Sequence, residues 1–166
     1  FFKQKTAYEI STRDWSSDVC SSDLRDMAAI WIGKLAGWLS RRLGRGGGTT
    51  LPGALARRIA PQVLTHLTAQ LPRGVICVAG TNGKTTTTRM IADVIAAAGW
   101  RVLHNRSGAN LVAGVTTTML TGADWRGRIH ADVALFECDE AALPQIVRAT
   151  QPRVVRSEEH TSELQS

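Results

Sequence analysis

A run of glycine, lysine and threonine, G-T-N-G-K-T at residues 80–85, has the composition of a loop that holds phosphate groups. Glycines let backbone N–H groups turn toward one point, a lysine neutralises phosphate charge, and the N-terminus of a following helix favours anions. The hydroxyl of Thr85 is placed to bind the Mg²⁺ that accompanies a nucleotide. The match is partial, because the usual pattern has a glycine five positions before Gly83 and this chain has Val78 there. A fortuitous glycine-rich turn is the alternative interpretation.

Acidic side chains form a second group, in the sequence F-E-C-D-E-A-A-L at residues 136–143. A carboxylate at the end of a buried strand can complete the shell of a Mg²⁺ ion, which takes few carboxylates besides phosphate and water oxygens. Glu137 is therefore a candidate metal ligand, and a solvated acid at a strand end is the alternative. Asp139 and Glu140 have a simpler alternative role, which is to cap the next helix.

The segments around these motifs alternate between strand and helix patterns. Residues 75–79, V-I-C-V-A, are continuously apolar and rich in β-branched side chains, which indicates a strand buried on both faces of a parallel sheet. Further strands are predicted at 100–104, 131–136 and from 152, with helices at 84–98, 111–120 and 141–149. Such alternation is typical of a doubly wound α/β fold, in which functional residues gather where strands end. Each motif follows a predicted strand, and this context favours phosphate binding over a chance turn.

Helical patterns precede the first strand. Residues 27–43 have apolar side chains at helical spacing, with Lys34, Arg41 and Arg42 between them, and shorter helices are predicted at 51–58 and 61–71. The first of these helices is too short and too basic to span a bilayer, which needs about 20 apolar residues. It is expected either to pack on its own domain or to lie on a membrane surface.

Both ends of the chain resemble translated sequencing adapter rather than protein. Residues 156–166 match the translation of a common adapter, residues 14–24 match its reverse complement, and residues 3–10 resemble the flow-cell end of such a molecule. Disordered polar tails are the alternative. The expected division is a disordered artefact at 1–24, a helical segment at 25–72, an incomplete nucleotide-binding domain at 73–155 and a second artefact at 156–166.

The charge and residue types of the chain limit the classes of partner that it is expected to bind. Residues 25–155 carry 16 basic and seven acidic side chains, a formal net charge of +9, which favours nucleotides, phospholipid surfaces or nucleic acid. Nucleic acid is not expected, because no helix has a dense basic stripe and few aromatic side chains are present for stacking. Cys77 and Cys138 form neither a disulfide framework nor a C-x-x-C pair, which fits a reducing cytoplasm.

The loop also carries a family resemblance. G-T-N-G-K-T-T, with Asn82 inside it and a threonine run after it, resembles the Mur ligases and the related folylpolyglutamate synthases. The segments at 44–52, 105–111 and 136–143 resemble the branch of the Mur ligases that amidates lipid II. The resemblance implies the P-loop-containing central domain of a Mur ligase, with a mostly parallel doubly wound sheet that is incomplete here.

The resemblance also implies roles for individual residues. The residues expected to bind ATP are Gly80, Thr81, Asn82, Gly83, Lys84, Thr85, Thr86 and Asn110. Thr85 and Glu137 are expected to bind Mg²⁺, and Lys84 and Glu137 are expected to be catalytic. For Asn110, an Asx turn or a helix cap is the alternative. The role of Arg106 stays open, because exposed arginines are common.

The activity implied is the phosphorylation of a carboxylate by ATP, which gives an acyl phosphate that an amine attacks. In the lipid II branch, the carboxylate is the α-carboxyl of D-glutamate in the stem peptide, ammonia comes from a GatD-type glutaminase subunit, and the product is D-isoglutamine. A zinc site is expected only beyond residue 155, and the fragment alone is expected to be inactive. A cytoplasmic location, with approach to the inner face of the membrane, follows from the lipid-linked substrate.

Rival functions remain at this point. Another amide ligase of the Mur or folylpolyglutamate type would add an amino acid instead of ammonia. A non-catalytic nucleotide-binding module of the same loop type is the alternative from a different class.

Overall fold

A computed structural model describes residues 19–42, 50–80, 82–105 and 108–157. Its centre is a parallel sheet formed by β1 (Val75–Ala79), β2 (Val102–His104), β3 (Val133–Cys138) and β4 (Val154–Ser157), in the order β2-β3-β1-β4. β1 lies between β3 and β4 and runs parallel to both. The strand that leads into the glycine loop is therefore internal, as its continuous apolar sequence predicts.

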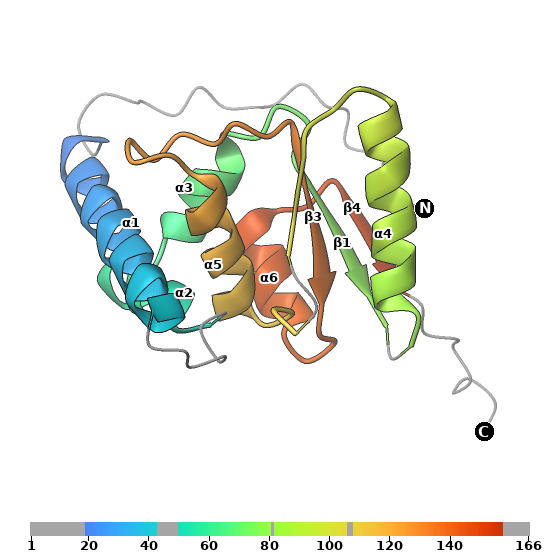
Figure 1. Cartoon of the computed structure of the whole chain (residues 1–166), viewed down its shortest axis with the longest axis horizontal. Helices are drawn as coiled ribbons and strands as arrows, with labels where there is room; N and C mark the ends of the chain where they lie inside the picture. Colours follow the sequence, from blue (N-terminus) through green and yellow to red (C-terminus); the bar gives the residue numbers. More distant parts are fainter. Residues whose placement is uncertain (1–18, 43–49, 81, 106–107, 158–166) are drawn as a thin grey trace, which may run out of the picture.

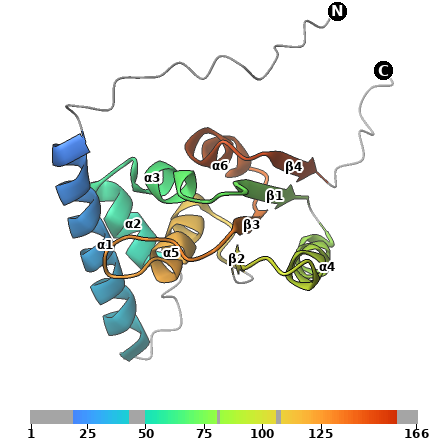
Figure 2. The same ribbon diagram turned by 90° about the horizontal axis from the view of Figure 1, so that it is seen from above.

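Helices cover both faces of this sheet. They are α1 (Val19–Arg42), α2 (Leu51–Ile59), α3 (Val63–Ala69), α4 (Lys84–Ala97), α5 (Val112–Gly122) and α6 (Leu143–Thr150). Figure 1 shows α4 on one face of the sheet and α5 and α6 on the other. In Figure 2, α1 is the outermost element on the α5 side, beyond α2. This arrangement confirms the predicted α/β class with helices on two sides of a parallel sheet.

One strand boundary differs from the prediction in a way that concerns the site. The predicted strand 131–136 ends before Glu137, whereas β3 continues through Cys138. The continuation has a partner, because Glu137 and Cys138 pair with Val78 and Ala79 of β1. Glu137 therefore lies inside a buried strand and not at its exposed end, which removes the interpretation as a solvated acid.

The ends of the described chain also depart from expectation. α1 begins at Val19, so the expected disorder of residues 1–24 is wrong for residues 19–24, where the helix continues toward the N-terminus. β4 runs to Ser157 because its last residues pair with the end of β1. The adapter origin of both ends stays a prediction, and residues 1–18 and 158–166 lie outside the described residues.

The N-terminal helices pack closely on α5. The amide of Gly53 in α2 donates a hydrogen bond to Thr117 Oγ1 of α5 at 2.9 Å. A Cβ at Gly53 would overlap the carbonyl oxygen of Ala113 and lie 2.8 Å from the Thr117 backbone nitrogen. Two helix backbones thus meet without an intervening side chain, and the absence of a Cβ is what permits their approach.

Substitution of Gly53 by alanine should expose this packing in the unfolding free energy. We expect Gly53→Ala to lower it by about 1–3 kcal/mol, because the added methyl forces two backbones apart. The control is Gly37→Ala in α1, where a Cβ would lie 3.4 Å from Pro52 Cγ, an ordinary contact. Urea denaturation followed by circular dichroism measures both variants. Equal stability of the two variants would contradict the proposed close approach.

Two cysteines lie in neighbouring strands beneath the glycine loop. Cys77 of β1 and Cys138 of β3 are fully buried. Hydrogen bonding with Cys77, together with burial, raises the pKa of Cys138 far above its ordinary value. A thiol that stays protonated and inaccessible is not a nucleophile. Both cysteines therefore belong to the packed core.

This burial is testable with a thiol reagent such as dithionitrobenzoate. In a Cys20→Ser background, which removes the third cysteine of the chain, we expect almost no reaction in the native state. After denaturation, Cys77 and Cys138 should both react. Rapid native labelling at either position would show that the strands below the loop open readily.

Candidate functional site

The glycine loop turns sharply between β1 and α4. Gly80 and Gly83 have positive φ angles of 150° and 78°, and the angle at Gly83 lies in the left-handed region that favours glycine. A Cβ at Gly83 would meet no atom within 4 Å. The backbone conformation, and not crowding, therefore requires glycine here. Backbone amides in such a turn can approach a ligand from this open side.

Helix α4 begins immediately after the turn. Gly83 is the residue that precedes its first turn, and no side chain caps this helix end. The ammonium group of Lys84 donates a hydrogen bond to the carbonyl oxygen of Gly80. The lysine side chain therefore reaches back across the loop, so that its charge and the positive end of the helix dipole act on the same small region.

Glu137 points toward α4 because of its place in β3. Its neighbours Phe136 and Cys138 belong to the apolar core that α5 and α6 cover, and side chains alternate along a strand. Glu137 Oε2 accepts a hydrogen bond from Thr85 Oγ1 at 3.0 Å. Only 7% of the Glu137 surface is exposed. The structure thus places a largely buried carboxylate against the second residue of α4.

The two residues predicted to bind Mg²⁺ are therefore in direct contact. Mg²⁺ takes oxygen ligands, usually one or two from protein, and completes its octahedron with phosphate and water oxygens. The hydroxyl of Thr85 and the carboxylate of Glu137 supply this donor set, on the edge of the sheet where the loop also lies. These residues fit the metal that the family resemblance implies.

A buried asparagine fixes the position of Glu137. Asn105, which follows β2 and is 3% exposed, accepts a hydrogen bond from the Glu137 backbone N–H at 2.8 Å. Its side-chain amide donates to the carbonyl oxygens of Glu137 and Ala109, each at 2.8 Å. Sequence reasoning did not single out Asn105. The available signal was a polar residue directly after an apolar strand, at the edge where the other motifs gather.

The remaining predicted residues differ in their placement. The backbone carbonyl of Asn110 accepts a hydrogen bond from the Asp139 N–H at 3.0 Å, which ties the loop after β2 to the end of β3. Asn82 and Thr86 are exposed beside the turn. Thr81 and Arg106 lie outside the described residues. The side chain of Asp139 accepts from the Ala141 N–H at 3.0 Å, a local turn before α6 that agrees with the capping alternative.

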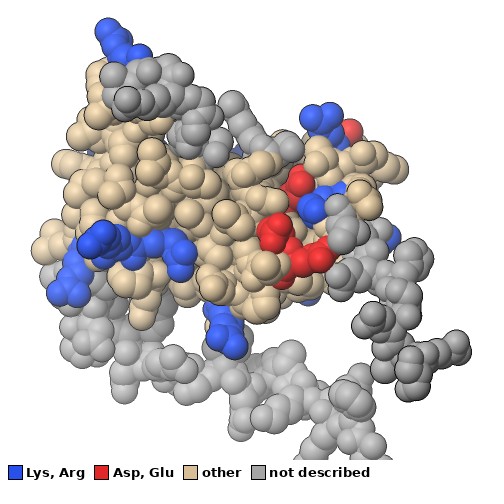
Figure 3. Space-filling view, turned by 90° about the horizontal axis from the view of Figure 1, so that it is seen from below, with Lys and Arg blue, Asp and Glu red and all other residues tan. Residues whose placement is uncertain are grey.

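Charge is unevenly distributed around this edge of the sheet. Figure 3 looks at the molecule from the side toward which β1 and β3 run, and acidic side chains gather there beside a basic one. Other basic side chains form a separate group toward the side of α1 and α2. Acidic side chains therefore gather on the face toward which β1 and β3 run, a pattern that suits a metal-bound phosphate more than a bare anion.

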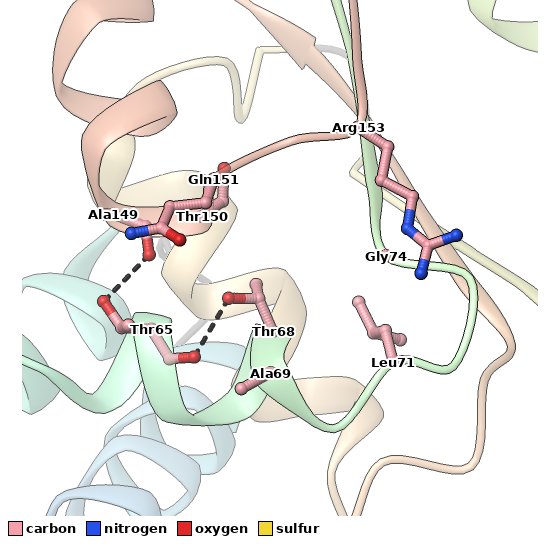
Figure 4. A pocket seen from close by; sticks show the side chains of 9 residues that line it. All are labelled: Thr65, Thr68, Ala69, Leu71, Gly74, Ala149, Thr150, Gln151 and Arg153. Carbon is pink, nitrogen blue, oxygen red and sulfur yellow. Dashed lines mark hydrogen bonds between the residues drawn. The ribbon is translucent and has the colours of Figure 1, made fainter. Parts of the chain in front are cut away.

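A cavity of about 210 Å³ lies where β1 and β4 begin, at the end of the sheet away from the glycine loop, between α3, α6 and the start of β4 (Figure 4). Thr65 Oγ1 donates to the Ala149 carbonyl across it at 2.8 Å, and Arg153 lies along its rim. Its threonine hydroxyls bond to nearby backbone, and it has no carboxylate, histidine or cysteine in its lining. The cavity lies between α3 and α6 and is separate from the candidate site at the glycine loop.

The role of Asn105 predicts a specific loss of stability. Asn105→Leu leaves the buried Glu137 N–H without its partner, so we expect the unfolding free energy to fall by about 1–3 kcal/mol. The neighbouring His104, which is exposed, provides the control, because His104→Ala should change stability by less than about 0.5 kcal/mol. Both variants can be compared by urea denaturation. If Asn105→Leu is as stable as His104→Ala, the asparagine does not hold the strand end.

Comparison with known proteins gives a sequence likeness. The chain is 34% identical over 132 residues to the lipid II isoglutaminyl synthase (glutamine-hydrolyzing) subunit MurT of Staphylococcus aureus (strain N315). The matched residues make up 80% of this chain and 29% of that protein. It is also 34% identical over 130 residues to the same subunit of Streptococcus pneumoniae (strain ATCC BAA-255 / R6), covering 78% of this chain and 28% of that one. The chain thus spans less than a third of these relatives. No known family profile matches it.

Among solved structures, the chain is similar to the UDP-N-acetylmuramoylalanyl-D-glutamyl-2,6-diaminopimelate–D-alanyl-D-alanyl ligase from Acinetobacter baumannii and to a crystal structure of MurF from the same organism. Each match has a TM-score of 0.49 and 24% identity, and covers 62% of this chain and 22% of the other. The sequence likeness extends over four fifths of the chain, and its sheet is the parallel one that the resemblance implied. On these grounds the chain belongs to the Mur ligase family.

Proposed function

We propose that this chain is the nucleotide-binding part of an ATP-dependent amide ligase. The observation that carries the proposal is the contact between Thr85 and Glu137, beside a glycine turn that Lys84 crosses. These groups have distinct tasks in phosphoryl transfer, which depends on positioning and on charge neutralisation. The likeness to MurT proteins supports the same conclusion.

In this proposal, the turn and the first amides of α4 bind the phosphates of ATP. The ammonium of Lys84 gives up its contact with the Gly80 carbonyl and binds a phosphate oxygen, which neutralises charge as the γ-phosphoryl group moves. Thr85 and Glu137 would hold Mg²⁺, which would neutralise charge on the nucleotide phosphates. Asn105 holds the Glu137 backbone, so the carboxylate keeps its position while the nucleotide changes.

The acceptor in this proposal is the α-carboxyl of D-glutamate in lipid II. Transfer of the γ-phosphoryl group to that carboxylate gives an acyl phosphate and ADP; attack by ammonia then expels inorganic phosphate and forms D-isoglutamine. The ammonia would come from a GatD-type glutaminase subunit in the cytoplasm. The MurT relatives are subunits of a glutamine-hydrolysing lipid II isoglutaminyl synthase, which supports this choice over ligases that add an amino acid.

Nucleotide affinity tests the proposed loop. Lys84→Ala should lower the affinity for ATP with Mg²⁺ by roughly 10- to 100-fold, because a charge-assisted hydrogen bond contributes about 1.5–3 kcal/mol. The matched control is Arg148→Ala, which removes one positive charge from the exposed last turn of α6, away from the loop. Isothermal titration calorimetry on the whole chain measures both. Near-normal affinity in Lys84→Ala, with the fold intact, would rule out the loop as the phosphate site.

The metal part of the proposal has its own test. Glu137→Gln keeps an oxygen for the Thr85 hydroxyl but removes the charge that holds Mg²⁺. We expect the affinity gained from added Mg²⁺ to fall, while the affinity for ATP without metal stays the same or rises slightly. An unchanged Mg²⁺ dependence would exclude Glu137 as a ligand and leave the assignment of Lys84 standing.

A further inference from the structure

Helix α1 has apolar side chains on two opposite faces. On the inner face, Ala29, Ile30 and Gly33 are buried against α2 and α5. The opposite face is formed by Leu24, Trp31, Ile32, Leu35, Trp38 and Leu39, and we call it the α1 outer face. Each of these six side chains exposes between 43% and 73% of its surface. A helix that is apolar all round normally has a partner on both sides.

A tryptophan from a different element extends this face. Trp125 lies in the connection between α5 and β3 and is 64% exposed. Trp31 Nε1 donates a hydrogen bond to the Trp125 carbonyl at 2.9 Å, and the Lys34 ammonium lies 5.4 Å from the centre of the Trp125 ring. Exposed tryptophans from two segments therefore form one continuous surface, larger than isolated apolar residues would make.

Most of the described charged side chains around the α1 outer face are basic. Arg25 and Arg42 of α1 are exposed, as are Arg126 and Arg128 beside Trp125, and the Arg42 guanidinium lies 5.6 Å from the centre of the Trp38 ring. Among the described side chains of α1 and of residues 123–130, the carboxylates are those of Asp26 and Asp124.

Both carboxylates have partners within the chain. Asp26 pairs with His66 of α3. Asp124 accepts hydrogen bonds from the backbone N–H groups of Arg126 and Arg128 at 2.8 and 2.9 Å, and it pairs with His130. These contacts hold the pKa of Asp124 below its ordinary value, with the backbone of Arg128 as the main cause. The carboxylates are engaged locally, and the arginines define the outward charge.

We propose that the α1 outer face and Trp125 bind the surface of an anionic lipid bilayer, with α1 lying in the plane of that surface. Tryptophan and leucine on one helix face with arginine around them is the composition of helices that lie at membrane interfaces. Indole rings settle at the level of the head groups, and arginines reach anionic lipid from the same position. None of the described helices has the length and hydropathy to cross a bilayer.

A second copy of this chain is a poorer occupant of the same face. A two-fold interface would place the patch against itself. The arginines at its margin would then face the arginines of the partner, while the described carboxylates of this surface, Asp26 and Asp124, are paired within their own chain. An anionic bilayer satisfies both the apolar and the basic part of the surface. The proposal is independent of the nucleotide site.

Vesicle flotation of the whole chain tests this proposal. We expect the protein to float with vesicles of phosphatidylcholine and phosphatidylglycerol, and to float much less with phosphatidylcholine alone or at high salt. Trp31→Ser combined with Leu35→Ser should lower partitioning at least roughly 10-fold, because two exposed apolar side chains no longer enter the interface. Substitution of exposed residues by serine should leave the fold intact, which circular dichroism checks.

The matched control is Met90→Ser combined with Val94→Ser. These residues are 64% and 70% exposed on α4, on the other side of the sheet, so partitioning should not change. Equal partitioning of the two double variants, or equal binding to neutral and anionic vesicles, would overturn the proposal. So would a concentration-dependent dimer that Trp31→Ser with Leu35→Ser abolishes while vesicles bind neither protein, because a second copy would then cover the face.

Discussion

The parallel pairing of β1 with β3 is the constraint on which the rest of the site depends. It sets Glu137 opposite Val78, two residues before the glycine turn, and so brings a carboxylate to the start of α4. A shift of one residue would turn this side chain into the apolar core, because neighbours in a strand point to opposite faces. The hydrogen bonds of Asn105 to both sides of the Glu137 peptide oppose such a shift. Register, and not the loop alone, thus determines where the proposed metal ligands lie.

Much of this arrangement follows from local sequence. The apolar, β-branched run 75–79 predicted a strand, and the glycines, Lys84 and the helical repeat after it predicted the turn and α4 in their observed places. The end of β3 could not be predicted in the same way. A charged residue normally ends a buried strand pattern, whereas Glu137 stays in the sheet because it has a β1 partner and the Thr85 hydroxyl as a neighbour. Asn105 was missed because its partners are 4 and 32 residues away in sequence.

Helix α1 is a second feature that the sequence pattern alone could not fully predict. Its apolar spacing predicted a helix, and packing on the domain and binding to a membrane surface were competing interpretations of its apolar side chains. In the structure one face contacts α2 and α5 while the opposite face is exposed. The packing alternative therefore holds for the inner face, and the membrane alternative is our proposal for the outer face. The extent of the outer face depends on tertiary contacts, because Trp125 joins it from a segment 94 residues after Trp31.

The position of α1 relative to the glycine loop allows the two proposed sites to work separately. Figure 2 places α1 and α4 at opposite ends of the layered arrangement, with the sheet between them. A bilayer bound to the α1 outer face would therefore not cover the start of α4, where Lys84 and Thr85 lie. Close packing at Gly53 joins α2 to α5, which lies on the sheet, and α2 also contacts α1. These close contacts fix the orientation of α1 relative to the sheet. In this proposal, a domain bound to the membrane through α1 keeps the glycine loop and the start of α4 accessible to an acceptor at the membrane surface.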